Sequence, residues 1–331
     1  MHLVMIGGSD AGISAALRAR ELDRGADVTV VLEDAYPNFS ICGIPYYLSG
    51  EVTPWRNLAH RTIADLEAAG MRLRLDTTAR RIDVPGRKLL VTSADGGEEV
   101  LGYDKLIVGT GAVPVRPQIG GVAGPGALGP ADGVHLLHSM GDTFAVMRTL
   151  EQAAPASAVI VGAGYIGLEM ADALTVRGLA VTQMEQLSEV LPTVDPELGA
   201  LVHAELAAHG VVVLTGTTVE AISKAPPGGS GRLHVQAKAA DGSTVTQTAD
   251  MVLVVVGVRP ETTLAAEATE LRAEEHHVRA PSTARHSAPP HHAPSHLGHS
   301  RRHRPACRQR VQQYGHHQPH HVGGGCGQHR P

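Results

Sequence analysis

The chain of 331 residues is long enough for about two domains of ordinary size, and its 43% hydrophobic residues can fill two cores. Three cysteines exclude a framework of several disulfides, and we expect a cytoplasmic protein because the sequence shows no secretory leader and no apolar run of about 18 residues. The formal net charge of −5 offers no basic surface, so neither nucleic acid nor a membrane is expected as a partner.

The first predicted element is a strand followed by a glycine-rich turn. The letters HLVMIGGSDAG contain Gly7, Gly8 and Gly12, with Ser9 where the middle glycine of a GxGxxG motif stands, and the next strand, VTVVLED, reaches Glu33. Glycine allows a tight turn close to a pyrophosphate, the following helix offers free N–H groups, and the acid can bind a ribose. An ordinary strand-helix turn is the alternative, but the acid favours a dinucleotide site.

The next segment, PNFSICGIPYYLSGEV, holds Cys42. A small buried hydrophobic residue is the usual role of an isolated cysteine. Here the cysteine follows the ribose-binding acid, and a helix that starts near Ile44 or Pro45 would lower the pKa of its thiol. The flanking Ser40 and Tyr46 could donate hydrogen bonds to a thiolate, or simply face solvent. The segment is interpreted as a redox element.

The remainder of the first 271 residues predicts an internal repeat. The first half continues with a hairpin turned at ADGG and a buried closing strand, YDKLIVGTGAVP. The second half runs through AVIVGAGYIG, VTQMEQ, a hairpin turned at ADGS, and ADMVLVVVGVRP. Two copies of the same order of elements predict two dinucleotide sites.

The second glycine turn matches GxGxxG fully. Gly162, Gly164 and Gly167 lie between an apolar strand, residues 158–161, and a helix of about residues 166–176. The next strand ends in Glu185, where a carboxylate accepts both ribose hydroxyls and repels a 2′-phosphate. The sequence therefore favours NAD(H) over NADP(H) at this site.

The end of the chain has a different composition. The last 56 residues hold 13 of the 20 histidines and 8 arginines, with no Asp, Glu or Lys, and show neither helical nor strand periodicity. Disorder is expected for residues 276–331. A metal-binding arm is the alternative, but its candidate ligands fit no zinc spacing well. These ligands are His291, His292, His316, His317, His320, His321, Cys307 and Cys326.

Four motifs in chain order, the first glycine turn, NFSICGIPYYLSGEV, YDKLIVGTGAVPVRP and VGAGYIGLEMA, resemble the flavin-dependent pyridine nucleotide disulfide oxidoreductases. The resemblance covers roughly residues 1–270 and is strongest to the single-cysteine branch of coenzyme A disulfide reductases and NADH oxidases. It implies an α/β protein with two Rossmann-like three-layer domains. An FAD-binding domain is expected at residues 1–112, an NAD(H)-binding domain at 113–258, and the start of a return segment at 259–275.

The resemblance also implies site residues. The first site would hold FAD through Gly7, Gly8, Ser9, Ala11, Gly12, Glu33, Gly109, Thr110 and Gly111. The second would hold NAD(H) through Gly162, Gly164, Tyr165, Ile166, Gly167, Glu185 and Gly257. Tyr165 matches an aromatic lid over the flavin, and Glu169 matches an acid near the isoalloxazine. Their alternatives are helix-start packing for Tyr165 and a solvated helix residue for Glu169. With Cys42, these two are the implied catalytic residues.

Cys42 matches the second, flavin-proximal cysteine of two-cysteine relatives, and Pro37 stands at the first position, so no internal disulfide can form there. The implied reaction passes a hydride from NADH to FAD and electrons through Cys42 to a small external disulfide, such as coenzyme A disulfide, or to oxygen. Peroxidase-like relatives carry a histidine where this chain has Asp10. Disulfide reduction is therefore ranked first, oxygen reduction second and peroxide chemistry third.

The family pattern breaks after the closing strand. Relatives continue with a Gly-Asp return segment and an interface domain through which they form homodimers, and neither is recognisable here. Reading PSHLGHSRRH one base later permits Ala-Gly-Asp, so we hypothesise a shifted reading frame around residues 270–290, which sequencing of the gene tests. Two alternatives stay open: a nucleotide-binding remnant without turnover, and a histidine-rich metal carrier.

Overall fold

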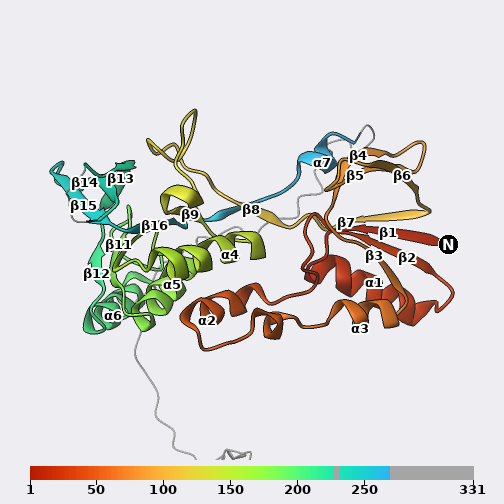
Figure 1. The fold of residues 1–331 in the computed structure, drawn as a ribbon, viewed down its shortest axis with the longest axis horizontal. Helices are drawn as coiled ribbons and strands as arrows, with labels where there is room; N and C mark the ends of the chain where they lie inside the picture. Colours follow the sequence, from red (N-terminus) through yellow and green to blue (C-terminus); the bar gives the residue numbers. More distant parts are fainter. Residues whose placement is uncertain (227–230, 269–331) are drawn as a thin grey trace, which may run out of the picture. The chain divides into compact units, whose positions relative to one another are not determined.

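The computed structural model describes residues 1–226 and 231–268. The predicted tail at residues 276–331, its candidate metal ligands and its hypothetical frame shift lie outside the described residues. No helix within the described ranges is long and apolar enough to cross a membrane. The described chain is an α/β structure built on two parallel sheets (Figure 1).

The first sheet has four parallel strands in the order β3-β2-β1-β7. Its strands are β1 (His2–Ile6), β2 (Asp27–Val31), β3 (Met71–Arg74) and β7 (Lys105–Val108). Figure 1 shows helices α1 (Asp10–Leu22) and α3 (Ile63–Ala68) on one face and the antiparallel strands β4 (Thr77–Asp83), β5 (Lys88–Ser93) and β6 (Glu98–Gly102) on the other. Each face buries its own apolar cluster, because parallel strands covered on both sides carry near-continuous apolar residues.

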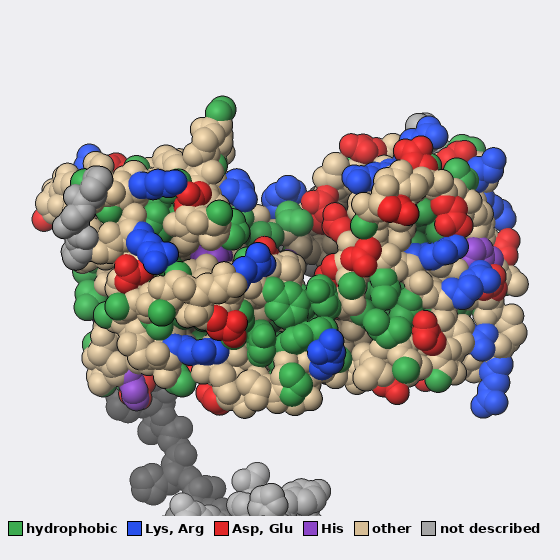
Figure 2. Space-filling model, in the orientation of Figure 1, with side chains coloured by type: hydrophobic (Ala, Val, Ile, Leu, Met, Phe, Trp, Pro, Cys, Tyr) green, Lys and Arg blue, Asp and Glu red, His purple; other side chains and the backbone are tan. Residues whose placement is uncertain are grey.

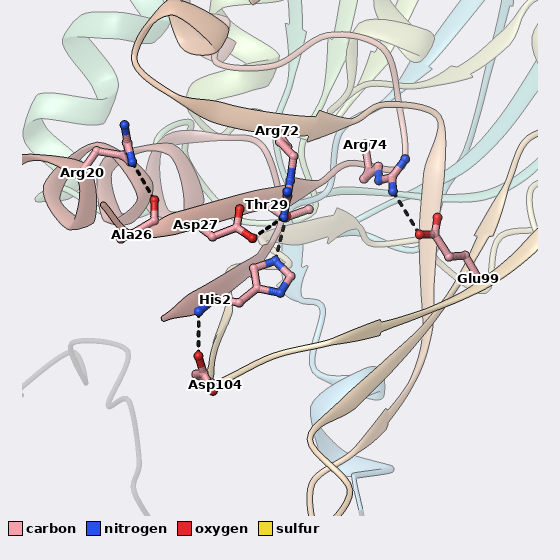
Figure 3. A network of polar contacts seen from close by, with 9 residues as sticks. All are labelled: His2, Arg20, Ala26, Asp27, Thr29, Arg72, Arg74, Glu99 and Asp104. Carbon is pink, nitrogen blue, oxygen red and sulfur yellow. Dashed lines mark hydrogen bonds and ion pairs between the residues drawn. The ribbon is translucent and has the colours of Figure 1, made fainter. Parts of the chain in front are cut away.

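Polar contacts join strands of the first half to one another (Figure 3). The His2 backbone N–H donates to Asp104 Oδ2 at 2.7 Å, and Arg72 pairs with Asp27 at 2.6 Å. The pair Arg74 and Glu99 joins β3 to β6 at 3.0 Å. These contacts are exposed, so their main effect is on the register of the strands and less on stability.

The second sheet has five parallel strands in the order β12-β11-β10-β16-β9. Its strands are β9 (Val134–Leu136), β10 (Ser157–Val161), β11 (Ala180–Met184), β12 (Val212–Leu214) and β16 (Met251–Val254). The helices of the second half are α4 (Met140–Arg148), α5 (Tyr165–Val176) and α6 (Pro196–Ala208). A separate antiparallel sheet contains β13 (Thr217–Lys224), β14 (Leu233–Ala239) and β15 (Thr244–Ala249). The strand-turn-helix order of the first half thus recurs, and the hairpins predicted at ADGG and ADGS are confirmed.

One predicted element differs from the structure. The apolar run at residues 251–258 is not one closing strand, because β16 ends at Val254 and Val258–Pro260 form a separate strand, β17, against β8 (Ala112–Pro114). Gly257, at a φ of +110°, turns the chain between the two, and its carbonyl accepts from the Val115 N–H at 2.9 Å. After β17 the chain packs a short helix, α7 (Thr263–Ala266), beside β4 and buries Ala268 in the first half.

Candidate functional site

The first glycine turn, the first cradle, comprises Gly7 to Gly12 between β1 and α1. Gly7 has a φ of +111°, and a Cβ atom there would lie 1.9 Å from the Gly109 carbonyl oxygen. A Cβ at Gly12 would lie 1.9 Å from the Gly7 carbonyl oxygen. Only glycine fits at these two places, so the turn lets β1, α1 and the Gly109 segment approach one another closely. Ser9 is the N-cap of α1 and is exposed.

The second cradle, Gly162 to Gly167, has the same construction. Gly162 has a φ of +104°, and its Cβ would meet the Val255 carbonyl oxygen at 2.7 Å. Gly167 packs the start of α5 onto the turn, since its Cβ would lie 2.2 Å from the Gly162 carbonyl oxygen. The middle glycine differs, because a Cβ at Gly164 would meet nothing within 4 Å. Space is therefore left open at the N-cap of α5, where backbone N–H groups favour an anion.

The two acids that follow the second strands have different surroundings. Glu185 is buried, its Oε2 accepts from the Ala163 N–H at 2.7 Å and its Oε1 accepts from the Leu187 N–H at 2.9 Å. The carboxylate thus joins the second cradle to the loop after β11. Glu33 is exposed and has no hydrogen-bond partner among the described residues.

Cys42 is exposed and lies in a single 3₁₀ turn, Ile41–Gly43, that leads directly into α2 (Ile44–Ser49). The predicted helix start near Ile44 is confirmed, with Gly43 as N-cap. Tyr46 is 54% exposed, and neither Tyr46 nor Ser40 makes a hydrogen bond to the Cys42 sulfur within the described part of the chain. The alternative role of a buried hydrophobic residue does not apply to Cys42.

Helix α2, which follows Cys42, packs against α5 of the second cradle. Ile44 and Leu48 are buried in the same apolar cluster as Met170 and Leu174 of α5. The Arg177 side chain at the end of α5 donates from Nε to the Leu48 carbonyl oxygen at 2.6 Å. This contact attaches the cysteine segment of the first half to α5 of the second half, which the linear sequence does not show.

An aromatic group adds a second connection between the halves. The rings of Tyr36, Trp55 and Phe144 pack edge to face with centroids 5.2 to 5.4 Å apart. Tyr36 follows β2, and Phe144 lies on α4. Figure 2 shows hydrophobic side chains beside α2 and α4, while side chains of both charge signs are spread over the rest of this face.

Tyr165 and Glu169 lie on the first turns of α5. Tyr165 is 59% exposed, and its hydroxyl accepts from Thr193 Oγ1 at 3.1 Å. Thr193 belongs to the loop after Glu185, which is also held by the Leu191 N–H donating to the Ala163 carbonyl at 2.8 Å. Partial burial raises the pKa of Glu169, so this carboxyl holds a proton more readily than an ordinary glutamate.

Two buried polar residues that sequence reasoning missed support the cradles. Asn38 is buried at a φ of 53°, its N–H donates to the Gly8 carbonyl at 2.8 Å, and its Nδ2 donates to Asp10 at 3.3 Å. It therefore fixes the cysteine segment on the first cradle. Gln183 is fully buried beneath the second cradle and donates to the Gly162 carbonyl at 3.1 Å. The sequence could have pointed to Gln183, because a glutamine is unexpected in the buried strand VTQM.

Thr110, Gly111 and Gly257 lie where β8 and β17 run antiparallel between the halves. The Thr110 hydroxyl donates to the Glu261 carbonyl oxygen, and the Glu261 N–H donates to the Gly111 carbonyl at 2.9 Å. Gly257 lies in this two-strand connection, two residues after Val255, whose carbonyl oxygen faces Gly162 of the second cradle. Gly8 lies in the first turn itself, whereas Ala11 and Ile166 are the second residues of α1 and α5.

Comparisons with known proteins agree with this architecture. A family model described as pyridine nucleotide-disulphide oxidoreductase matches residues 1–280. The chain is 30% identical over 270 residues to an NADH oxidase of Methanocaldococcus jannaschii, covering 81% of this chain and 57% of the relative. It is 32% identical over 265 residues to a CoA-dependent NAD(P)H sulfur oxidoreductase of Pyrococcus furiosus, covering 80% and 55%.

A solved structure, an NAD-dependent persulfide reductase from A. fulgidus, superposes with a TM-score of 0.72 and 33% identity over 81% of this chain and 47% of that protein. The chain thus spans little more than half the length of the curated relatives it matches.

Proposed function

Because the chain belongs to the pyridine nucleotide-disulphide oxidoreductase family, we propose that it is a flavoprotein that oxidises NADH and passes two electrons through Cys42 to a small disulfide. The reaction balances as NADH, one proton and one disulfide giving NAD⁺ and two thiols. One observation carries the proposal: the exposed Cys42 leads into α2, and α2 packs on α5, the helix of the second cradle.

The residues of the first cradle fit the ADP part of FAD. Gly7 and Gly12 leave no room for a side chain, and Ser9 and Glu33 are exposed. Gly111 lies at the end of the first half, and an added Cβ there would meet nothing within 4 Å. We keep the domain limits of 1–112 for the FAD part and 113–258 for the NAD(H) part as proposals.

The residues of the second cradle fit NAD(H). The open space at Gly164 lies at the start of α5, a helix of 12 residues whose N–H groups and dipole favour a pyrophosphate. Glu185 is already held in place by two backbone N–H groups, which orients its carboxylate before a ribose arrives. A second phosphate on that ribose would meet this negative charge, so we propose a preference for NADH over NADPH.

When bound, the nicotinamide and the flavin supply the hydride chemistry, and the chain's own groups supply position and protons. Cys42 offers a solvent-accessible sulfur that can form a mixed disulfide with an external thiol. Tyr165 is proposed as the movable aromatic residue at the start of α5, because its ring is exposed and only its hydroxyl is held. Glu169, whose pKa is raised by burial, is proposed to carry a proton near the reacting rings.

A small disulfide is preferred over oxygen as the acceptor. Two of the relatives described above carry sulfur or persulfide reduction in their names, and one of them is CoA-dependent. The third is named an NADH oxidase, so oxygen is the second acceptor to test. Asp10, whose carboxylate accepts from Asn38, offers no neutral proton donor beside the first cradle for peroxide chemistry.

Anaerobic titration of the purified full chain with NADH tests the proposal. We expect a yellow protein whose flavin absorbance is bleached by NADH and restored by coenzyme A disulfide. Cys42→Ser should keep the bleaching but lower disulfide reduction by about a hundredfold or more, since the attacking sulfur is lost. Ser40→Ala is the matched control in the same turn. Unchanged disulfide reduction in Cys42→Ser would contradict the role of this sulfur.

One observation favours a second candidate, a nucleotide-binding protein without flavin turnover. The first sheet has four strands among the described residues, whereas the second has five. A colourless purified protein that still binds NADH would support this candidate and remove the first.

A further inference from the structure

We propose that Arg177 is a positioning residue for Cys42: its guanidinium holds the far end of α2 on α4 and α5, and thereby fixes the sulfur relative to the second cradle. The proposal rests on the function proposed above, in which Cys42 passes electrons to a small disulfide. Arg177 is the C-cap of α5, and its backbone N–H donates to the Ala173 carbonyl oxygen at 3.2 Å. Its side chain therefore starts from a fixed point on the helix of the second cradle.

The Arg177 side chain joins three helices. Its Nε donates to the Leu48 carbonyl oxygen of α2 at 2.6 Å, and its Nη2 donates weakly to the Met147 sulfur of α4 at 3.7 Å. The same Nη2 would lie 3.7 Å from a Cβ atom at Gly50, the C-cap of α2. Figure 1 shows α2 beside α4 and α5. The guanidinium thus lies where the ends of the three helices meet.

The Leu48 carbonyl needs such a donor. Helix α2 comprises only six residues, and the last four carbonyl groups of a helix have no N–H partner within it. Leu48 is 0% exposed, so its carbonyl oxygen lies away from water. A buried carbonyl without a donor is unfavourable, and Arg177 supplies the donor from the neighbouring helix.

The other end of the cysteine segment is attached to the first half. The Ser40 N–H donates to the Leu58 carbonyl oxygen at 2.7 Å, and the Gly43 N–H donates to the Ser40 carbonyl oxygen at 3.1 Å. A Cβ atom at Gly43 would lie 2.6 Å from the Leu58 side chain, so the turn that carries Cys42 lies close to this leucine. The cysteine therefore lies between an attachment to the first half and an attachment to the second.

Apolar packing alone does not set this position. Ile44 and Leu48 are the buried residues of α2, and both belong to the apolar cluster that includes α5. A helix of six residues is not stable by itself, and apolar contacts are not directional. The hydrogen bond from Arg177 is directional, so it limits how far α2 can slide or tilt over α5. A shift of about 1 Å in a reacting atom lowers the rate of a positioned reaction by up to about a hundredfold.

Kinetics of the full chain with Arg177→Met test the proposal, because methionine keeps an apolar stem and removes the donors. We expect an unchanged rate of flavin bleaching by NADH, since the second cradle is intact. The kcat for coenzyme A disulfide should fall about tenfold with little change in KM. Arg177→Lys keeps a donor for the Leu48 carbonyl and should restore kcat to within about threefold of the parent chain. Arg148→Ala, at an exposed arginine of α4, is the matched control.

A distance measurement tests the same position without flavin. Cys307→Ser and Cys326→Ser leave Cys42 as the single native cysteine, and Leu201→Cys adds a second label site on α6, where Leu201 is 68% exposed. With nitroxide labels at both sites, electron spin resonance gives the distribution of distances between Cys42 and the second half. Arg177→Met should broaden this distribution. Arg177→Lys and Arg148→Ala should leave it as narrow as in the parent chain.

The outcomes separate this inference from the proposed function. An unchanged distance distribution in Arg177→Met overturns the inference, and so does an unchanged kcat in a chain whose disulfide reduction needs Cys42. Bleaching that slows as much as kcat also overturns it, because the second cradle would then be damaged. If Cys42→Ser keeps full disulfide reduction, or the parent chain is colourless, the proposed function fails and the distance distribution alone decides the inference. Circular dichroism checks folding, and Arg177→Ala is a second variant without a donor.

Discussion

The two halves of this chain hold the acids that follow their second strands in opposite ways. Glu185 in the second half is buried and accepts two backbone N–H groups, whereas Glu33 in the first half is exposed and has no partner among the described residues. The second sheet also continues on both sides of its closing strand β16, whereas among the described residues the first sheet ends at β7. The acid of the second half is therefore held by the protein's own hydrogen bonds, while the acid of the first half has none among the described residues.

The largest effect is expected at a glycine that leaves no room for a side chain. Gly7→Ala forces a Cβ to within 1.9 Å of the Gly109 carbonyl oxygen at a φ of +111°. We expect a loss of about 3 kcal/mol or more in the free energy of unfolding, measured by urea denaturation.

Gly164→Ala, at the middle position of the second cradle, is the contrasting variant. Its Cβ meets no protein atom within 4 Å, so stability should change by less than about 1 kcal/mol, while NADH binding weakens about tenfold or more because the methyl group takes the space of the pyrophosphate. Gly102→Ala, also free of neighbours, is the control that should change neither quantity. Full NADH affinity in Gly164→Ala would refute the pyrophosphate position.

The acids give the next prediction. Glu185→Gln replaces one acceptor oxygen by an NH₂ group and leaves a buried N–H of Ala163 or Leu187 unsatisfied, which should cost up to about 3 kcal/mol of unfolding free energy. Glu33→Gln at the exposed acid should change stability by less than about 0.5 kcal/mol. Chemical denaturation of both variants measures the difference. Equal losses would show that the acids are not held differently.

A buried histidine makes the second half sensitive to acid. His135 on β9 is 1% exposed, and burial lowers its pKa from 6.5 to about 4. The folded state therefore resists protonation: the stability it contributes is complete above pH 6.5 and is lost as the pH falls toward 4. Between pH 7.5 and pH 5 the loss should be about 2 kcal/mol.

His135→Gln should remove most of that pH dependence, measured as the difference in unfolding free energy between pH 7.5 and pH 5. His203→Gln is a control at a partly exposed histidine of the same half. A pH dependence that persists in His135→Gln would assign the acid sensitivity to other groups.

The smallest effect is expected at the hydroxyl pair on α5. Thr193→Val removes the donor to the Tyr165 hydroxyl, and Tyr165→Phe removes the acceptor of the same 3.1 Å bond. If Tyr165 moves when nicotinamide enters, each variant should tighten NADH binding about two- to threefold, because the bond that holds the ring is gone. The double variant should add nothing further. Thr193→Ser keeps the hydroxyl and should behave as the parent chain in fluorescence titration with NADH.

Local sequence patterns predicted most of the fold. A short stretch of sequence reveals four kinds of feature: glycines at positive φ, an acid after each second strand, turn residues at both hairpins, and apolar strands. Each of them depends on the backbone preferences of single residues and on their near neighbours in the chain. The apolar run at residues 251–258 does not form a single strand, because apolar character alone does not tell where a strand leaves its sheet. Gly257 and the pairing of β17 with β8 decide that point.

The sequence by itself determined the two glycine cradles, their acids and the presence of one cysteine between them, because each depends on residue type and spacing along the chain. Only the tertiary structure decided that Cys42 is exposed, that its helix α2 packs on α5, and that Asn38 and Gln183 support the cradles. These features join segments that are far apart in the chain, and their contacts arise from the packing of complete sheets and helices, which no short stretch of sequence encodes.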